Sequence, residues 1–398
     1  MKKLLFFLMV VLLSITGIKA QWEQTTFPSV VVPWCSASHG GSDVLFGTDM
    51  GGLYITADNG ETWSWSKPDE DSITGDAVIS IVIKDSDIFI GTFWQIFLSS
   101  DNGNTWVPVT DTFASCTHYR ALAIKGTDIF AGTDYCGIIK SSDNGNSWFL
   151  ANNGLPNCCG VNSLVVNDSN IFAGTYAGIF ISSDNGSTWS AVNNGLTDTF
   201  VLSLTVKDST IFAGTQNGGI YFSTDNGNNW TASNNGLTLP DAIHSLVPYP
   251  NSSFIFAGTY SGVFLSYNDG NSWVSVSQGL PANPAISTIT IGGTYAFAGT
   301  LISGVWRRQL LEMIDGIGEN NNIEQLSLYP NPTNGEFVLK GDGIISVLVQ
   351  NVLGVIIFTS QDIEQSSIEI DLSNYPKGIY FVNINKREKL YRKIIVIQ

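Results

Sequence analysis

The sequence predicts an all-β protein: a seven-bladed β-propeller followed by a small Ig-like β-sandwich. A Gly-Thr pair recurs seven times at intervals of 40 to 44 residues, which is the length of a four-stranded blade. Each pair ends an apolar run of strand length. From Leu326 onward this period is replaced by short strands with turns between them, as expected for a sandwich.

Each repeat unit is predicted to form four strands, and the fourth unit shows them most clearly, over residues 161–166, 170–175, 178–183 and 188–192. The seventh unit contains only three such runs. Residues 22–27, which begin with Trp22, look like the missing fourth strand. We therefore predict that they pair with residues 304–308 and close the ring, leaving no free edge. We expect a monomer.

A second motif follows the first six Gly-Thr pairs and is clearest as Ser-Ser-Asp-Asn-Gly-Ser-Thr-Trp at residues 182–189. It predicts a hairpin turn, because the Asp carboxylate accepts bonds from turn amides and Gly adopts a positive φ. A weaker copy lies at residues 268–273. The full copies contribute Asp58, Asp101, Asp143, Asp184 and Asp225.

These turns resemble the Asp-box, or BNR, repeat of sialidases, sortilin-type receptors, xyloglucan-degrading glucanases and photosystem assembly propellers. The resemblance covers roughly residues 22–308 and implies a propeller in which the five Asp side chains are structural. Each turn offers only one or two carboxylates, whereas calcium requires about 6 to 8 oxygen ligands. No zinc-ligand spacing is present, and we expect no metal and no cofactor.

One position in every unit is predicted to face the propeller axis, where only small side chains fit. It lies eleven residues before the Gly of each Gly-Thr pair, or thirteen in the sixth unit. The position is occupied by Ser36, Ser80, Ala121, Ser163, Ser203, Ser245 and Thr288.

The loops beside this position differ from unit to unit, and variable loops on a regular scaffold are where function can enter. They combine aromatic, amide and acidic groups, which suits stacking on a sugar or gripping a protein segment. We predict a glycan or protein ligand on this top face; the alternative is that these residues only plug the channel. The candidate ligand-binding residues are Phe93, Trp94, His118, Tyr119, Arg120, Asp134, Tyr135, Tyr176, His244 and Tyr260.

Catalysis is the competing hypothesis. A sialidase grips its substrate with three arginines, but the propeller region has only Arg120, Arg307 and Arg308, the last two adjacent on one strand. A glycoside hydrolase like the xyloglucanases needs only two carboxylates across a cleft. Asp49, Asp76, Asp134 and Asp241 are predicted to lie near the top face, and Asp134 and Asp241 are the catalytic candidates. The sequence favours binding without catalysis. Between Gln21 and Asp315, 25 acidic residues outnumber 8 basic ones, which argues against a nucleic-acid partner.

The two ends of the chain indicate export. Lys2 and Lys3 precede a short apolar run that ends in small residues at Ala20, which predicts a signal peptide over residues 1–20. We expect no transmembrane segment, because no other apolar run approaches about 18 residues. We assign residues 21–311 to the propeller, 312–325 to a linker and 326–398 to the sandwich.

Within the sandwich, the motifs Leu-Tyr-Pro-Asn-Pro at residues 328–332 and Tyr-Pro-Lys-Gly-Ile-Tyr at residues 375–380 resemble the type A sorting domain of the type IX secretion system. The resemblance covers nearly all of residues 326–398. It implies that the secretion machinery is a partner. It also implies that the protein is released from, or attached to the surface of, a Bacteroidetes-type bacterium.

Five cysteines leave at least one unpaired. After alignment of the repeats, Cys116, Cys136 and either Cys158 or Cys159 fall in neighbouring loops, and the pairing among these and Cys35 is left open. One disulfide is reasonable in an oxidising compartment. Two pairings of Cys158 and Cys159 are open: a disulfide between the two, and a disulfide from one of them to Cys116 or Cys136. The second is favoured.

Overall fold

The structure is a computed structural model that describes residues 21–67, 76–110, 116–157, 160–250, 252–315, 326–341, 343–351, 356–361, 366–386 and 389–397. The predicted signal peptide and most of the predicted linker lie outside the described residues, as do Cys158 and Cys159.

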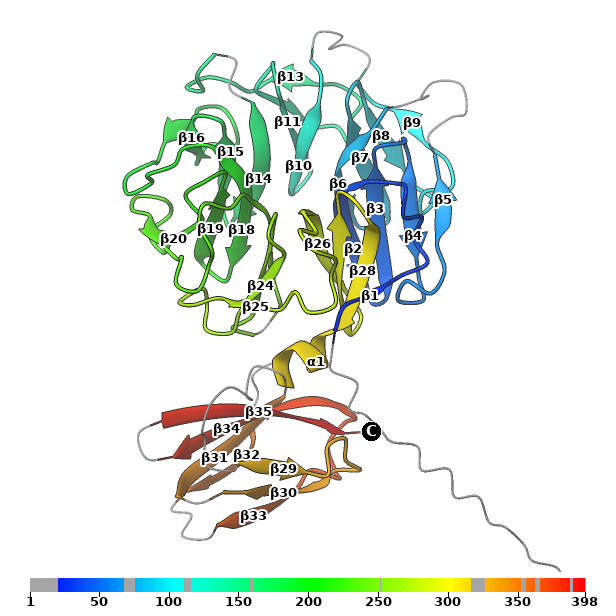
Figure 1. The fold of residues 1–398 in the computed structure, drawn as a ribbon. Helices are drawn as coiled ribbons and strands as arrows, with labels where there is room; N and C mark the ends of the chain where they lie inside the picture. Colours follow the sequence, from blue (N-terminus) through cyan, green and yellow to red (C-terminus); the bar gives the residue numbers. More distant parts are fainter. Residues whose placement is uncertain are drawn as a thin grey trace, which may run out of the picture.

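Seven four-stranded antiparallel sheets stand around a common axis, so the predicted seven-bladed propeller is confirmed (Figure 1). Blade one contains β2 (Pro33–Gly40), β3 (Asp43–Thr48), β4 (Leu53–Thr56) and β5 (Ser64–Ser66). Blade two contains β6 (Val78–Lys84), β7 (Asp87–Thr92), β8 (Ile96–Ser99) and β9 (Val107–Pro108). Blade three contains β10 (Tyr119–Lys125), β11 (Asp128–Thr133), β12 (Ile138–Ser141) and β13 (Phe149–Leu150).

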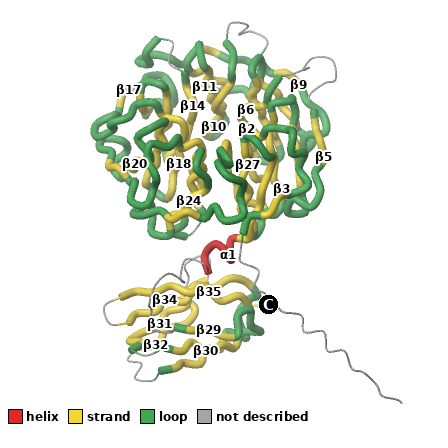
Figure 2. The backbone as a smooth tube through the Cα atoms, in the orientation of Figure 1, coloured by secondary structure: helices red, strands yellow, loops and turns green. Residues whose placement is uncertain are grey.

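Blade four contains β14 (Val161–Asn167), β15 (Asn170–Thr175), β16 (Gly178–Ser182) and β17 (Ser190–Ala191). Blade five contains β18 (Val201–Lys207), β19 (Thr210–Thr215), β20 (Ile220–Ser223) and β21 (Thr231–Ala232). Blade six contains β22 (Ile243–Pro248), β23 (Ile255–Thr259), β24 (Val263–Ser266) and β25 (Val274–Ser275). In each of these blades the first strand is innermost and the fourth is a short outer strand. Figure 2 shows inner strands such as β10 and β14 near the middle of the propeller, and outer strands such as β5 and β17 at its sides.

Blade seven is completed from the other end of the propeller sequence, as predicted. It contains β26 (Ile286–Gly292), β27 (Tyr295–Thr300) and β28 (Gly304–Gln309), and β1 (Glu23–Gln24) pairs with β28 through Glu23↔Arg307 and Gln24↔Trp306. The Thr25 amide donates to the Val305 carbonyl at 3.1 Å. The guanidinium of Arg307 forms ion pairs with Glu23 at 2.7 Å and with Glu61 of blade one at 2.6 Å. One side chain of blade seven therefore connects the N-terminal strand to blade one.

Trp22 occupies the place that the motif tryptophans occupy elsewhere. The indole Nε1 of Trp189 donates to the Ala151 carbonyl of the preceding blade, and Trp22 Nε1 donates in the same way to Val276 at 2.7 Å. The backbone amide of Trp22 donates to the Gln278 carbonyl, as that of Trp189 does to Asn153. The side chain of Trp22 is 1% exposed, so the closure buries a full indole.

Each Asp-box turn is a self-contained set of hydrogen bonds. In the fourth unit, Asp184 Oδ1 accepts the Thr188 amide at 2.8 Å, and Oδ2 accepts the Thr188 hydroxyl at 2.6 Å. The Ser182 hydroxyl donates to Asp184 and accepts the Gly186 amide. Asn185 adopts a positive φ of 60° beside Gly186, so two residues, rather than the Gly alone, carry the left-handed backbone.

These bonds stabilise the charged form of the carboxylate. Hydrogen bonds from Thr62, Thr105 and Thr188 lower the pKa of Asp58, Asp101 and Asp184 to about 2. Hydrogen bonds from Ser147 and Asn229 likewise lower the pKa of Asp143 and Asp225. Within the described residues, no group of three or more His, Cys, Asp or Glu side chains is arranged to hold a metal ion.

In blade one, the residue predicted for the axis-facing position is wrong. In blade two Ser80 lies opposite Gly91, but in blade one Cys35 rather than Ser36 lies opposite Gly47. The hairpin between β2 and β3 contains a register shift between Ser38 and Gly40, and this extra residue displaces the count by one. Cys35 is a free cysteine, and burial raises the pKa of its thiol strongly.

The C-terminal unit is a two-sheet sandwich. One sheet has the order β29 (Ser327–Tyr329), β30 (Glu336–Lys340), β33 (Ser367–Asp371). The other has the order β32 (Ile356–Gln361), β31 (Ile344–Asn351), β34 (Gly378–Lys386), β35 (Lys389–Ile397). Side chains such as Phe337, Val349 and Ile395 from both sheets share one buried core.

A short helix that the sequence analysis did not predict, α1 (Leu310–Asp315), follows β28 directly. Leu310 and Met313 are buried in the same cluster as Trp22 and Phe381, so α1 packs where the ring closes. Gln309 pairs with Tyr295, at the end of β28 opposite to the Thr300–Gly304 turn. No helix in the described residues is long and apolar enough to cross a membrane.

Candidate functional site: the mouth of the central channel

One backbone irregularity recurs in all seven innermost strands. In β10, Tyr119 pairs with Thr133 and Ala121 with Gly132, which leaves Arg120 as the extra residue of a β-bulge. The register shifts at the same place in the other six innermost strands. The seven bulge residues are Trp34, Ile79, Arg120, Asn162, Leu202, His244 and Ser287.

All seven bulge residues line one cavity of about 550 Å³ at the axis of the ring. Because a bulge redirects one side chain, seven bulges redirect one side chain from every blade to a shared space. A volume of this size lies within the range of small-molecule and peptide-end pockets. We call this space, together with the loops around it, the channel mouth.

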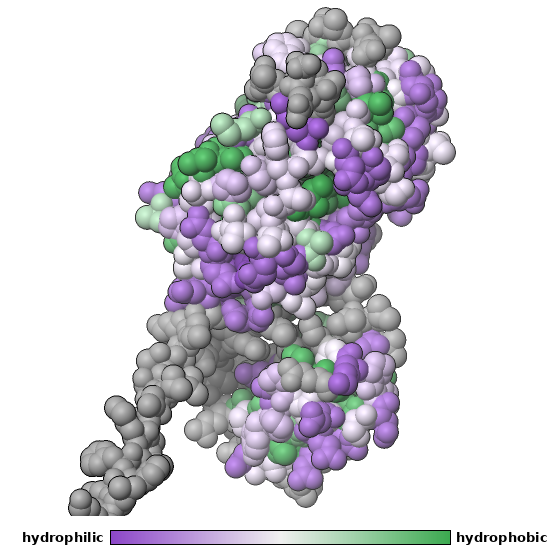
Figure 3. Space-filling view, turned by 90° about the vertical axis from the view of Figure 1, so that its right-hand side faces the viewer, coloured by the Kyte–Doolittle hydropathy of each residue, from purple (hydrophilic) through white to green (hydrophobic). Residues whose placement is uncertain are grey.

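A rim of exposed apolar side chains surrounds the channel mouth, and every blade contributes at least one. We call this set the crown: Trp34, Met50, Trp94, Tyr135, Tyr176, Phe200, Tyr260 and Ile302. Most of these residues follow the second strand of a blade, whose Gly-Thr end lies at the top face. On the side of the molecule shown in Figure 3, by contrast, hydrophobic residues form small patches separated by hydrophilic surface.

Blade three carries the most polar part of the channel mouth. Arg120 donates from Nε to Asp134 Oδ1, and the hydroxyl of Tyr176 from blade four donates to the same oxygen at 3.0 Å. Asp134 is 8% exposed, whereas the Arg120 side chain is 37% exposed. Burial disfavours the charged guanidinium, but the bond to Asp134 outweighs it and the pKa of Arg120 is raised.

His118 lies beside this pair with an unusual backbone. Its φ is 57°, its ring centroid is 4.5 Å from that of Phe93, and its Nδ1 lies 3.9 Å from Asp134 Oδ2. A disulfide between Cys116 and Cys136 joins the segment before β10 to the loop after β11. It brackets His118 and Asp134, and so it fixes the two loops that carry the polar cluster.

On the other side of the ring, His244 packs edge-on against Tyr260, with their ring centroids 4.7 Å apart. Its Nε2 is buried without a hydrogen-bond partner. Burial lowers the pKa of His244, which favours the neutral imidazole.

Two predicted site residues have other surroundings than expected. Tyr119 is fully buried and packs with Phe89 and Ile129, so it is a core residue and not a ligand-contacting one. Asp241 accepts the backbone amides of Tyr260 and Ser261 at 3.1 and 3.2 Å. Asp198 accepts two turn amides in blade five in the same way, which makes this a loop cap rather than a group aimed at a substrate.

Neither Asp134 nor Asp241 is among the residues that line the cavity. Trp34 could not be recognised from the sequence as the bulge residue of blade one, because β2 contains an extra residue that only the strand register shows. Phe200 was overlooked because it precedes β18 instead of following β19. The ring centroids of Phe200 and Tyr176 lie 4.6 Å apart.

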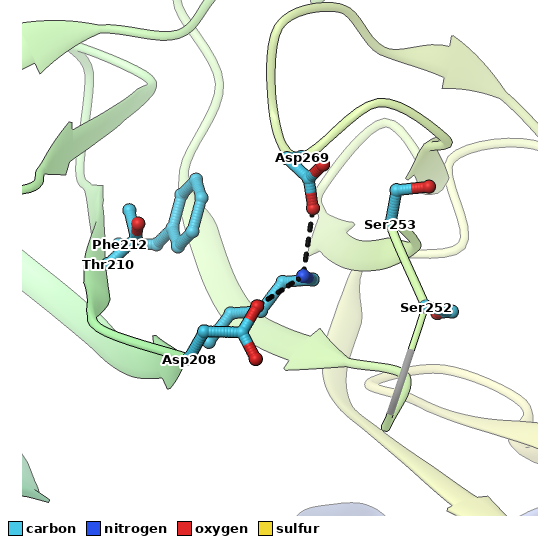
Figure 4. Close-up of a pocket in the computed structure, with 7 residues that line it drawn as sticks. Asp208, Thr210, Phe212, Ser252, Ser253 and Asp269 are labelled. Atoms are coloured by element: carbon cyan, nitrogen blue, oxygen red, sulfur yellow. Dashed lines mark hydrogen bonds and ion pairs between the residues drawn. The ribbon is translucent and has the colours of Figure 1, made fainter. Parts of the chain in front are cut away.

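A second pocket, of about 410 Å³, lies at the opposite rim between blades five and six (Figure 4). Lys207 Nζ lies 2.8 Å from Asp269 and 3.0 Å from Asp208. The corresponding Lys84 bonds to Asn144 of the next blade at 3.1 Å. Because the contact repeats between blades, it is best explained as a tie between neighbouring sheets.

Fold and sequence together define the class: a secreted or cell-surface Asp-box β-propeller with a C-terminal sorting domain. Residues 327–398 match the family described as the secretion system C-terminal sorting domain. A second family model, the DUF6242 β-propeller domain, matches residues 112–253 and, overlapping them, 174–304. The sorting domain engages the type IX secretion machinery, as predicted. No curated protein sequence matches the chain.

Several solved structures share the fold. The extracellular domain of the one-component system BT4673 from B. thetaiotaomicron is 17% identical, with a TM-score of 0.60; the match covers 94% of this chain and 52% of that one. The chain therefore spans about half of that domain. YCF48 bound to D1 peptide is 14% identical, with a TM-score of 0.56 and coverage of 72% and 96%. A GH74 xyloglucanase from Xanthomonas campestris is 14% identical, with a TM-score of 0.56 and coverage of 82% and 60%.

Proposed function

We propose that this protein is an exported recognition module that binds a glycan or a protein segment at its channel mouth, without catalysing a reaction. One observation carries the proposal: all seven blades direct a bulge residue into the same cavity and place an exposed apolar side chain on its rim. Exposed apolar side chains gathered at a cavity are typical of binding sites.

The polar groups of the mouth support binding in a defined orientation. Arg120 and Tyr176 come from different blades and are both fixed by Asp134, so their positions depend on the rigid ring and not on a single loop. The Cys116–Cys136 disulfide restricts the loops beside them. A site held in this way loses little conformational entropy when a ligand binds. YCF48, which shares the fold, was solved with a bound peptide, in keeping with a propeller as a binding platform.

Hydrolysis of a glycan is the second candidate, because the GH74 xyloglucanase shares the fold. The carboxylates offered by the sequence are poorly placed for it. Asp241 already accepts two backbone amides, and Asp134 is occupied by Arg120 and Tyr176. A glycosidase acid must reach the glycosidic oxygen from the cleft, and neither side chain lines the cavity.

The test is to expose the purified full chain to a glycan array and to a peptide array, and to assay the same glycans for hydrolysis. We expect saturable binding to one class of ligand and no turnover. Turnover that disappears in Asp134→Asn or Asp241→Asn would replace the binding proposal with the glycosidase. If the protein bound to neither array, and its Tm equalled that of a freshly secreted sample and so showed it to be folded, a recognition role for the channel mouth would be contradicted.

A further inference from the structure

The described residues that line the cavity include basic side chains and no acidic one. The chain carries 34 acidic against 18 basic residues, yet no Asp or Glu is among the described residues that line the cavity. Apart from the thiol of Cys35 and the phenol of Tyr260, the ionisable side chains among these residues are Arg120, His118 and His244. In an acidic protein, a wall whose described residues include an arginine and no carboxylate is suited to an anionic group.

Arg120 is the group that can bind such an anion. Its Nε is used by Asp134, and within the described residues its terminal nitrogens have no protein partner. Asp134 lies behind it, 8% exposed and outside the cavity lining, so the carboxylate orients the guanidinium without occupying the space in front. A planar guanidinium held along one edge offers its remaining N–H groups for a bidentate contact with a carboxylate.

Apart from His244, whose Nε2 has no partner, much of the rest of the wall is apolar or already bonded to the protein. Ile79, Leu202 and Leu301, from three other blades, line the same cavity as Arg120. The Ser80 hydroxyl donates to the Tyr119 carbonyl at 2.6 Å, and the Asn162 amide donates to the Val201 carbonyl at 2.8 Å. Ser36 and Thr288 bond to each other at 2.6 Å. A buried sugar needs partners for many hydroxyl groups, and this wall has few to give.

We propose that the channel mouth binds a protein segment that places a carboxylate on Arg120 and an apolar side chain against Ile79, Leu202 and Leu301. The inference rests on the proposed recognition function and narrows it to one class of partner. The carboxylate comes from the free C-terminus of the segment or from an Asp or Glu side chain. The crown residues Trp94 and Tyr135, which are both 63% exposed, contact the part of the segment outside the cavity.

The test uses an array of short synthetic peptides in three matched forms, applied to the full chain. One form has a free C-terminal carboxylate, the second is amidated there, and the third is amidated but carries Asp or Glu within the sequence. We expect binding to the first or third form, and about tenfold or greater weakening when the carboxylate is removed. Which of the two forms binds identifies the source of the carboxylate.

Arg120→Met should lose the same preference, whereas Lys125→Met, at the other end of β10, should not. Because Arg120→Met leaves Asp134 buried without its partner, the double variant Arg120→Met/Asp134→Asn provides a second measurement with the charge removed. Equal binding to all three peptide forms, unchanged in both Arg120 variants, would overturn the carboxylate inference while leaving recognition intact. Binding to glycans alone would overturn it in the same way, and binding to nothing would overturn both proposals.

Discussion

The two rims of the propeller are built from the same repeats but use their polar residues differently. At the lower rim, each Asp-box carboxylate bonds within its own turn, as Asp184 does with Thr188 and Ser182. At the channel mouth, polar side chains bond between blades, as Tyr176 of blade four does with Asp134 of blade three. The Asp-box carboxylates are therefore bonded within repeated turns, and lysines such as Lys207 tie neighbouring blades at the same rim. The mouth, by contrast, differs from blade to blade and has groups left over for a ligand.

This difference separates residues that maintain the ring from residues that are free to vary. Four of the motif tryptophans, Trp148, Trp189, Trp230 and Trp273, are buried like Trp22 and donate to the preceding blade in the same way. The crown residues are exposed and stabilise little. Substitution of a buried tryptophan should therefore lower stability more than binding. Substitution of a crown residue should lower binding more than stability.

The largest expected effect is at the closure. Trp22→Ala removes a buried indole and its hydrogen bond to Val276, so we expect a loss of about 3–5 kcal/mol in the free energy of unfolding. Chemical denaturation of the full chain measures it. Trp65→Ala, at an outer-strand position that is 56% exposed, is the matched control and should change little. Equal effects of the two substitutions would mean that residues 22–27 do not close the ring.

The second effect is at the disulfide, which closes a loop of about 20 residues. Replacing both Cys116 and Cys136 with Ser should cost roughly 3 kcal/mol of stability. It should also weaken ligand binding, because it loosens the segments that carry His118 and Asp134. Calorimetry and a binding titration on the double variant measure both. A variant that is destabilised but binds normally would show that the bridge supports the scaffold only.

The third effect is acid sensitivity of the lower rim. The pKa of Asp58, Asp101 and Asp184 is about 2 in the folded protein and near 3.9 in an unfolded chain. A lowered folded pKa gives stability that is complete above the unfolded value, and that is lost as the pH falls from about 4 towards 2.

Asp184→Asn should reduce this acid-dependent part of the stability without breaking the turn. Asn268 already serves in the sixth unit, where its Oδ1 accepts the Ser272 amide at 2.9 Å. Denaturation curves for both proteins between pH 2 and pH 6 compare them. Identical pH profiles would show that the turns contribute nothing through their charge.

The smallest effect on stability is expected in the crown. Trp94 is 63% exposed, so Trp94→Ala should change the unfolding free energy by less than about 0.5 kcal/mol. Its effect on ligand affinity should exceed that on stability, since exposed aromatic side chains at a recognition surface often dominate binding. A Tm shift as large as that of Trp22→Ala would place Trp94 in the scaffold.

The fold could be predicted from the sequence because it depends on repeated residues. Seven Gly-Thr pairs give the blades, and the unpaired Trp-led segment at residue 22 gives the closure. Where a single unit departs from the repeat, the prediction was wrong: one extra residue in β2 moved the axis position from Ser36 to Cys35. Local insertions change register without changing the pattern of apolar residues.

The channel mouth was less predictable because it depends on which way individual side chains point. Alignment of the repeats made the consecutive residues Tyr119 and Arg120 equal candidates for the site. The bulge directs Arg120 into the cavity and leaves Tyr119 in the core. The alignment equally could not show that Asp241 caps a loop. The pairing of Cys116 with Cys136 was one of several open possibilities until the two loops were placed in space.

The most direct test compares the crown with the outer wall of the same blades. One variant replaces Trp34, Trp94 and Tyr135 with Ala, and the other replaces Trp65, Val107 and Phe149, which are exposed residues on the outer strands. Binding of the ligand found on the arrays is measured for both, alongside their Tm values. We predict that the crown variant loses binding at an unchanged Tm and that the wall variant binds normally. Loss of binding in the wall variant, with the crown variant unaffected, would contradict a recognition site at the channel mouth.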